Sequence, residues 1–183
     1  MEELNWKLLS SEYLFKDNWA TLRADTCQMP SGNIIKPYYV LEYPDWVNVV
    51  ALTEDNEVIL IRQYRHAAGA VLLEVPGGCI DKDESPEQAV RRELLEETGY
   101  DFREVELLSI LYANPATGNN KTHCFLATGG KKVQEQALDG GEEIVVELVS
   151  LQQLKELVIE NQIGQALHAS GIFYALMRLQ LLT

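Results

Sequence analysis

The sequence predicts a mixed α/β protein made of one domain with a small added element. Strand-like runs and helical runs alternate along its 183 residues, and 46% of those residues are hydrophobic, enough to bury a sizeable core. A helix with well-defined ends lies near the middle of the chain. This order and composition fit a sheet that is sandwiched by helices.

Five runs rich in β-branched and aromatic residues precede the central helix and are predicted to be strands. Turn signals separate several of them, including Pro30-Ser31-Gly32 and Pro44-Asp45. The predicted strands cover residues 19–28, 34–42, 47–53, 58–64 and 71–75.

The second half of the chain continues the mixed pattern. Further strands are predicted at residues 105–112, 123–127 and 144–149, followed by helices at 152–160 and 164–181. The last helix is predicted because its apolar residues recur at roughly helical spacing.

The segment from Gly78 to Tyr100, GCIDKDESPEQAVRRELLEETGY, contains the clearest local signals. Ser85 and Gln88 match a capping box, and Pro86 suits the first turn of a helix. Thr98-Gly99 is the corresponding stop signal. A helix is therefore predicted between Ser85 and Gly99.

Three glutamates gather on one side of this helix. At roughly 100° per residue, Glu93, Glu96 and Glu97 fall within an arc of about 100°, and Glu97 lies about 20° from the apolar Val90. Clustered carboxylates that stay ionised need basic side chains or a cation, and hard oxygen ligands favour Mg²⁺ or Mn²⁺. The alternative is a solvated helix face with i,i+4 pairs such as Arg92 with Glu96.

The segment resembles the Nudix box: a glycine, five residues, a glutamate, seven residues, then Arg-Glu-aliphatic-any-Glu-Glu-any-Gly-aliphatic. Every specified position matches except the last, which is Tyr100. Members of this family use Mg²⁺ or Mn²⁺ to hydrolyse a nucleoside diphosphate linked to a further moiety. The resemblance implies a Nudix-type α/β/α sandwich with a mixed sheet at residues 46–183. Residues 1–45 are expected to form an N-terminal β-rich dimerisation element.

Three features resemble the subgroup that hydrolyses ADP-ribose and related nucleoside diphosphate sugars. They are RQYR before the box, EVPGG immediately ahead of it, and Pro115 after it. In that subgroup the N-terminal element builds a homodimer whose active sites take residues from both chains. The resemblance thus implies a homodimer acting on a small nucleotide sugar, with ADP-ribose leading and GDP-mannose second. As an alternative, Pro115 shapes a loop.

The resemblance also assigns roles to single residues. Glu93 and Glu97 are expected to be catalytic through the metal, and Glu84 and Arg92 to pair and orient the loop and helix. The expected metal ligands are the backbone carbonyl of Gly77 and the carboxylates of Glu93, Glu96 and Glu97.

The general base is expected on a late loop, LDGGEEIVVELVS. Gly140 stands where some family members hold a base, which leaves Glu142 as the best candidate for base or metal ligand. Glu143 and Asp139 stay open, as does a flexible turn with solvated acids. The Asp-Gly-Gly turn could close over substrate.

The formal net charge of −13 argues against binding to a nucleic-acid backbone. An anionic diphosphate would need metal ions and local arginines to overcome this field. Arg65 and Arg62 are the best-placed basic residues, with ordinary surface charges as the alternative. Trp46, with Tyr38 or Tyr39 nearby in sequence, could stack on a nucleobase, or it could belong to the core or a dimer interface.

No run of 18 apolar residues occurs, and the start MEELNWK is unlike a signal peptide, so a cytoplasmic protein without membrane contact is expected. Cys27, Cys79 and Cys124 are expected to be free thiols. Two alternatives remain for the function. One is a Nudix hydrolase of other nucleoside polyphosphates, and the other is a non-catalytic nucleotide-sensing module, although all four box glutamates are kept.

Overall fold

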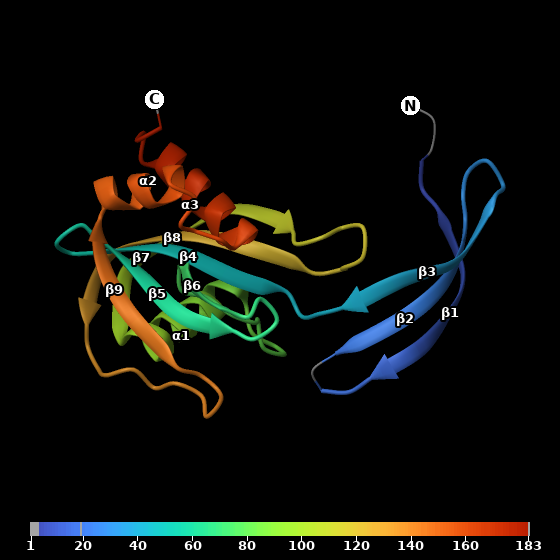
Figure 1. The fold of residues 1–183 in the computed structure, drawn as a ribbon, viewed down its shortest axis with the longest axis horizontal. Coiled ribbons are helices and arrows are strands. Elements are labelled where there is room, and N and C mark those ends of the chain that lie inside the picture. The colour runs from blue at the N-terminus through green and yellow to red at the C-terminus, as the bar shows by residue number, and fades with distance from the viewer. Residues whose placement is uncertain (1–3, 19, 183) are drawn as a thin grey trace. The chain divides into compact units, whose positions relative to one another are not determined.

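The computed structural model describes residues 4–18 and 20–182 (Figure 1). Trp19, the expected start of the second strand, lies outside the described residues. The elements in chain order are β1 (Lys7–Lys16), β2 (Thr21–Gln28), β3 (Ile34–Glu42), β4 (Trp46–Thr53), β5 (Glu57–Arg65), β6 (Ala70–Glu74), α1 (Pro86–Thr98), β7 (Tyr100–Tyr112), β8 (Lys121–Lys132), β9 (Ile144–Ser150), α2 (Leu151–Ile159) and α3 (Ala166–Arg178).

The chain divides into two compact units. The first comprises Met1–Pro44 and Tyr112–Lys121, and the second comprises Asp45–Leu111 and Thr122–Thr183. The first unit is built on a three-stranded antiparallel sheet of order β1-β2-β3. This sheet confirms the predicted β-rich N-terminal element.

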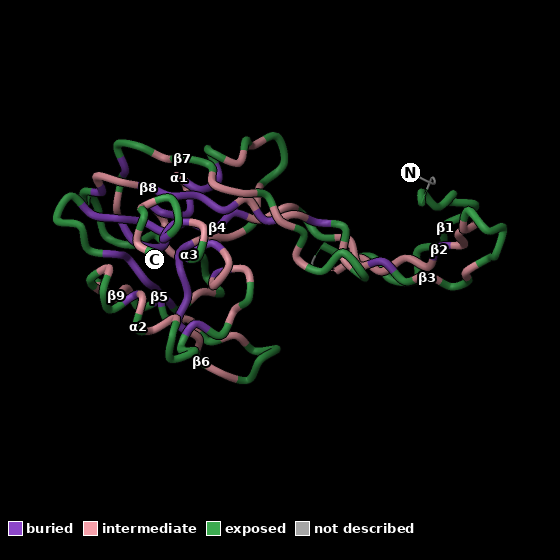
Figure 2. The backbone as a smooth tube through the Cα atoms, turned by 90° about the horizontal axis from the view of Figure 1, so that it is seen from above, coloured by how far each residue is buried: buried purple, intermediate pink, exposed green. Residues whose placement is uncertain are grey.

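Strand β1 was not among the predicted strands. All of its residues are exposed, so its sequence lacks the alternation of apolar and polar residues that a half-buried strand would show. Figure 2 shows this exposure along the strand. Its apolar side chains include Leu8, Leu14 and Phe15, each about half exposed.

The second unit is built on a six-stranded mixed sheet of order β6-β5-β4-β8-β7, with β9 paired to β5. β4 and β8 run parallel, whereas β5 is antiparallel to β4, β6 and β9. β5 pairs with β4 at Val58 and Ile59 and then with β6 from Ile61 onward. The pairing partner of β5 therefore changes from β4 to β6 along the strand, next to the segment that leads into α1.

Helices cover both faces of this sheet (Figure 1). On one face, α1 packs against Val47, Val49 and Ala51 of β4. On the other, α2 and α3 pack against Val50 and Leu52 of the same strand. Because successive side chains of a strand point to opposite faces, β4 contributes to both cores, which confirms the predicted α/β/α sandwich.

Strand β8 extends to Lys132, beyond the predicted residues 123–127. The paired glycines Gly129 and Gly130 hid this continuation, since glycine is depleted in strands. Gly129 has a φ of 70° and lies where the β4–β8 register shifts, as at a β-bulge. Among the described residues, none of the helices has the length and apolar character that a membrane span requires.

Candidate active site

Helix α1 begins and ends where its sequence predicts. The Ser85 hydroxyl accepts a hydrogen bond from the Gln88 N–H at 3.2 Å, and the Gln88 side chain accepts one from the Ser85 N–H at 2.8 Å. Gly99 ends the helix in the left-handed region, with a φ of 77°. These caps set the limits of the helix.

Glu93 and Glu97 lie on the buried side of α1. Their exposed fractions are 9% and 3%, and they share this side with Ala89, Val90 and Leu94. The expected placement of a carboxylate on the apolar stripe is thereby confirmed. Two carboxylates buried on one helix face are costly unless another group compensates their charge.

The segment before the box brings backbone groups close to these carboxylates. It runs beside β4, where the Val49 N–H donates to the Pro76 carbonyl at 3.0 Å and the Val47 N–H to the Gly78 carbonyl at 2.9 Å. Between these two bonds, the Gly77 N–H donates to Glu97 Oε2 at 2.9 Å. Gly77 thus lies against the carboxylate it was expected to join in a metal site.

Gly77 has no room for a side chain, and a side chain at Gly78 would displace the Glu93 carboxylate. A Cβ at Gly77 would overlap the Val47 carbonyl, and the φ of 154° there disfavours other residues. A Cβ at Gly78 would overlap the Glu93 carboxylate. The glycine pair therefore allows the chain to pass directly over the acidic face of α1.

Arg92 connects the acidic groups of the box. Its Nε and Nη2 donate to the two carboxylate oxygens of Glu84, each at 3.0 Å, so the expected Glu84–Arg92 pair is present. Its Nη1 donates to Glu93 at 2.9 Å and to Glu96 at 3.1 Å. The i,i+4 pair with Glu96 is therefore also present, and Glu96 is partly exposed.

The acidic face of α1 has too little positive charge nearby to keep Glu93 and Glu97 fully ionised. Burial raises the pKa of Glu97 well above its ordinary value, against the Gly77 hydrogen bond, and the charges of Glu93 and Glu142 raise it further. Burial likewise raises the pKa of Glu93, against the lowering effect of Arg92. An added cation would favour the ionised form of both groups.

Glu142, the expected base, comes from the turn before β9. Its backbone N–H donates to the Asp139 carbonyl at 2.9 Å, and its carboxylate accepts from the Asp139 N–H at 3.3 Å. Its charge acts on both Glu93 and Glu97, so the late loop lies within electrostatic reach of α1. Glu143 beside it is exposed.

The donor set fits a hard divalent cation in its chemistry. Carboxylates and backbone carbonyls are the ligands that Mg²⁺ and Mn²⁺ take. Within residues 4–18 and 20–182, however, no three acidic, histidine or cysteine side chains are arranged closely enough to enclose an ion. Arg92 already engages oxygens of Glu93 and Glu96, so these carboxylates would have to turn toward a bound cation.

Arg65 and Arg62, the expected phosphate-binding residues, both have carboxylate partners. Arg65 lies at the end of β5 and donates from Nη2 to Glu74 Oε2 at 2.6 Å and from Nε at 3.2 Å. Glu74 is fully buried. Arg62 pairs with Glu147 of β9 at the surface. Glu74 belongs to the EVPGG stretch, but nothing in the local sequence pattern indicated a role for it.

Trp46 and Pro115 lie in different units. Trp46 starts β4 and is half-buried, with its side chain beside that of Cys79. Pro115 is exposed in the Tyr112–Lys121 segment of the first unit. In that unit, the Tyr38 hydroxyl donates to the Ala116 carbonyl at 2.7 Å. The three cysteines are free thiols, as expected.

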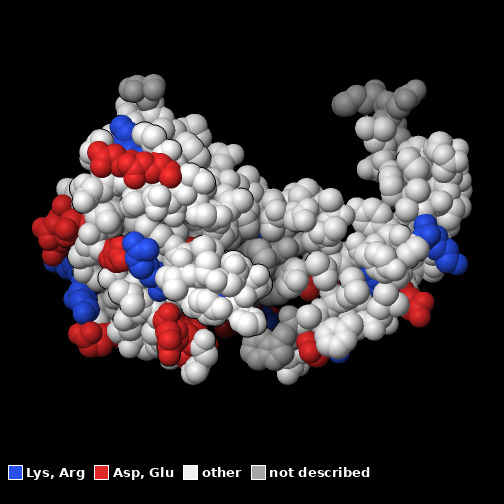
Figure 3. All heavy atoms as spheres, in the orientation of Figure 1, with Lys and Arg blue, Asp and Glu red and all other residues white. Residues whose placement is uncertain are grey.

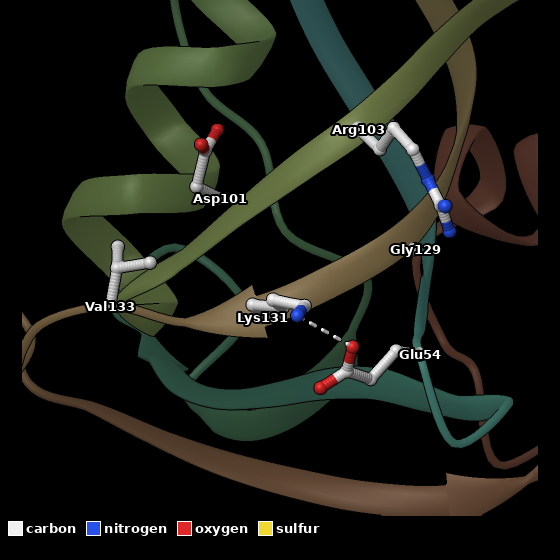
Figure 4. A pocket seen from close by; sticks show the side chains of 6 residues that line it. All are labelled: Glu54, Asp101, Arg103, Gly129, Lys131 and Val133. Carbon is white, nitrogen blue, oxygen red and sulfur yellow. Dashed lines mark ion pairs between the residues drawn. The ribbon is translucent and has the colours of Figure 1, made fainter.

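A cavity of about 400 Å³ lies elsewhere in the second unit, and Figure 4 shows the residues that line it. Lys131 and Glu54 form an ion pair of 3.1 Å at its wall. It contains none of the box carboxylates. The lining residues are Glu54, Asp101, Arg103, Gly129, Lys131 and Val133.

Two family models match the chain along most of its length. Residues 42–169 match the NUDIX domain, and residues 6–41 match the nucleoside diphosphate sugar hydrolase N-terminal domain. The chain therefore belongs to the Nudix family of hydrolases, in the group of enzymes that have this N-terminal domain.

Individual relatives agree with this placement. An ADP-ribose pyrophosphatase of Bacillus subtilis (strain 168) is 30% identical over 95% of this chain and 94% of its own length. A GDP-mannose pyrophosphatase of Citrobacter koseri is 29% identical over 91% of this chain and 97% of its own. A crystal structure of an ADP compounds hydrolase superposes with a TM-score of 0.87 at 22% identity, covering 98% of this chain and 97% of that one.

Proposed function

We propose that this enzyme hydrolyses the phosphoanhydride bond of nucleoside diphosphate sugars, with ADP-ribose as its leading substrate and GDP-mannose as the second. The observation that supports this most is the pair of buried carboxylates, Glu93 and Glu97, beneath the backbone of Gly77 and Gly78. The products are a nucleoside monophosphate and a sugar phosphate.

Mg²⁺, or Mn²⁺ in its place, would be held by the Gly77 carbonyl and by Glu93, Glu96 and Glu97. When bound, such an ion neutralises charge on the diphosphate and lowers the pKa of an attacking water. Arg92 positions the acidic groups, because its guanidinium donates hydrogen bonds both to Glu84 of the loop and to Glu93 of the helix.

Glu142 is proposed as the general base. Its charge already acts on Glu93 and Glu97, and its carboxylate would accept the proton from the attacking water. The turn that holds it contains Gly140 and Gly141, where a Cβ would meet nothing within 4 Å. Because no atoms crowd these two glycines, the turn has space to move toward bound substrate.

The diphosphate is proposed to contact Arg65, whereas Arg62, three residues earlier on β5, lies beside α2 with Glu147 and Gln153 and is not brought to the acidic face. Arg65 lies within electrostatic reach of Glu97 and Glu142, so a phosphate that it binds would be near the acidic face. Trp46 is the proposed stacking surface for the base, and Pro115 is proposed as a further substrate-binding residue. ADP-ribose ranks first because the relative named for it matches 95% of the chain.

We further propose a homodimer built through residues 1–45. The three-stranded sheet is too small to bury its own apolar residues, and β1 leaves several of them exposed. Figure 3 shows that the visible face of this unit is mostly uncharged, whereas acidic groups are prominent on the second unit. An uncharged face with exposed apolar side chains suits a permanent interface.

The proposal is tested by incubating purified protein with Mg²⁺ and a panel of nucleotides, followed by chromatography of the products. The panel holds ADP-ribose, GDP-mannose, UDP-glucose, diadenosine polyphosphates and nucleoside triphosphates. Release of AMP from ADP-ribose, ahead of GMP from GDP-mannose, is the expected result. Preferred cleavage of triphosphates or polyphosphates would overturn the substrate class, and no cleavage at all would favour a sensing module.

A further inference from the structure

Glu74, Arg65 and His168 form a cluster in the second unit. They come from three elements of the second unit: β6, β5 and α3. The Glu74 carboxylate is fully buried, and His168 is 8% exposed, with its Nδ1 3.9 Å from Glu74 Oε2. A buried carboxylate away from the expected ligands needs a physical reason, because its burial costs several kcal/mol unless it is paired.

Arg65 supplies the positive charge that compensates Glu74. Its Nε and Nη2 both donate to this carboxylate. His168 does not share the role, because burial lowers its pKa to about 4 and leaves the imidazole neutral near pH 7. The ion pair is therefore between Glu74 and Arg65, with a neutral histidine beside it.

The pair restricts how the Arg65 guanidinium can be oriented. Two donors on one carboxylate define the plane of the group, which a single hydrogen bond would not do. Its third nitrogen, Nη1, has no hydrogen-bond acceptor in the described part of the chain, and the side chain is 40% exposed. Glu97 and Glu142 lie within electrostatic reach of the same guanidinium. Arg65 thus keeps donors for an anion near the proposed metal ligands.

We propose that Glu74 is a positioning residue, which holds the Arg65 guanidinium so that its remaining N–H groups meet the diphosphate of the substrate. This inference rests on the proposed function, in which Arg65 binds that diphosphate. Arg62 offers the contrast, since its partner Glu147 is one-third exposed and both groups can move in solvent. The buried carboxylate makes Arg65 the better-fixed arginine of the strand.

The test compares Glu74→Gln, Arg65→Lys and the double variant with the wild-type enzyme. Glu74→Gln keeps the shape but removes the charge, and Arg65→Lys keeps the charge but removes the two-pronged contact. KM and kcat are measured for ADP-ribose, and the Kd of ADP is measured by calorimetry with Mg²⁺ present. Glu106→Gln is the matched control, because it breaks a surface pair with Arg178 in the same unit.

Each single variant is expected to raise KM and Kd by about tenfold, the size of one charged hydrogen bond, while kcat stays within about threefold. The double variant should bind no more poorly than the more impaired of the two single variants, because Glu74 acts through Arg65. Melting temperatures establish whether each variant is folded. If Glu74→Gln does not fold, Glu74→Asp keeps the charge but displaces the guanidinium, and it should also raise KM and Kd.

Two results would overturn the inference. One is a Glu74 variant with unchanged KM and Kd although Arg65→Lys raises both, and the other is a double variant whose losses simply add. Unchanged binding in Arg65→Lys would instead refute the substrate role of Arg65 and the inference with it. If ADP binding responds as expected but no nucleotide sugar is hydrolysed, Glu74 keeps its role and the proposed reaction is wrong.

Discussion

The backbone N–H of Gly77 donates a hydrogen bond to the buried Glu97 carboxylate at 2.9 Å. This contact joins two segments that lie on either side of the box loop. It places the Gly77 peptide against the acidic face of α1, where a Cβ at the next residue, Gly78, would overlap the Glu93 carboxylate. The close approach of this loop to the carboxylates is the basis of the first prediction.

Substituting Gly78→Ala should lower kcat/KM by about a hundredfold, the scale of a misplacement of about 1 Å in an active site. The added methyl group would overlap the Glu93 carboxylate and force either the loop or the side chain to shift. Gly164→Ala is the control, because its Cβ would make only an ordinary contact with Leu72. Equal kinetics of the two variants would contradict the assigned approach.

Glu97→Gln should reduce turnover by at least about a hundredfold, because it keeps the shape of the side chain but removes a proposed ligand charge. The comparison is Glu87→Gln on the same helix, which alters an exposed pair with Arg91. Initial rates at saturating Mg²⁺ and substrate provide the measurement. Near-full turnover of Glu97→Gln would refute its role as a metal ligand.

Trp46→Ala should raise KM for ADP-ribose about tenfold if the indole stacks on the base, since such stacking is worth about 1–3 kcal/mol. Because Trp46 also lies beside Cys79, the melting temperature must be measured with the kinetics. An unchanged KM at preserved stability would remove the stacking role. A large loss of stability would assign Trp46 to the core.

The buried His168 should make folding stability depend on pH. Its pKa falls from 6.5 to about 4 on folding, so between these values the unfolded chain binds a proton that the folded protein does not. The free energy of unfolding should therefore decrease as pH falls from about 6.5 to about 4, by up to roughly 3 kcal/mol from this group. In His168→Gln this contribution should be absent.

Denaturant unfolding at several pH values, with wild type and His168→Gln side by side, measures that contribution as the difference between two curves. Other acidic groups titrate in both proteins and cancel in this difference. Above about pH 6.5 the two curves should run parallel. Parallel curves down to pH 4 as well would show that His168 takes up its proton normally in the folded protein.

Light scattering should give the mass of a homodimer at assay concentrations. Leu14→Glu, at a half-exposed position of strand β1, should shift the protein toward monomers because it adds a charge to an apolar surface. Ile159→Glu is the control, an equally apolar position that is 80% exposed at the end of α2. A monomeric wild-type protein would overturn the proposed assembly.

Local signals in the sequence determined much of the fold and the acidic part of the site. The caps at Ser85 and Gly99 depend on residues close together in the chain, so they set the limits of α1, and helical periodicity indicates the side on which Glu93 and Glu97 lie. The strand at residues 34–42 was likewise predicted with both of its ends. Strand β1 was missed because neither of its faces is buried within the described chain.

Only the tertiary structure decided which distant residues meet. Glu74 and Arg65 approach because β5 and β6 are paired in register, and His168 reaches them because α3 packs across the sheet. The contact of Gly77 with Glu97 depends on how the loop runs along β4. Sequence periodicity reports which face a residue occupies within its own element, whereas these contacts depend on the pairing of elements far apart in the chain.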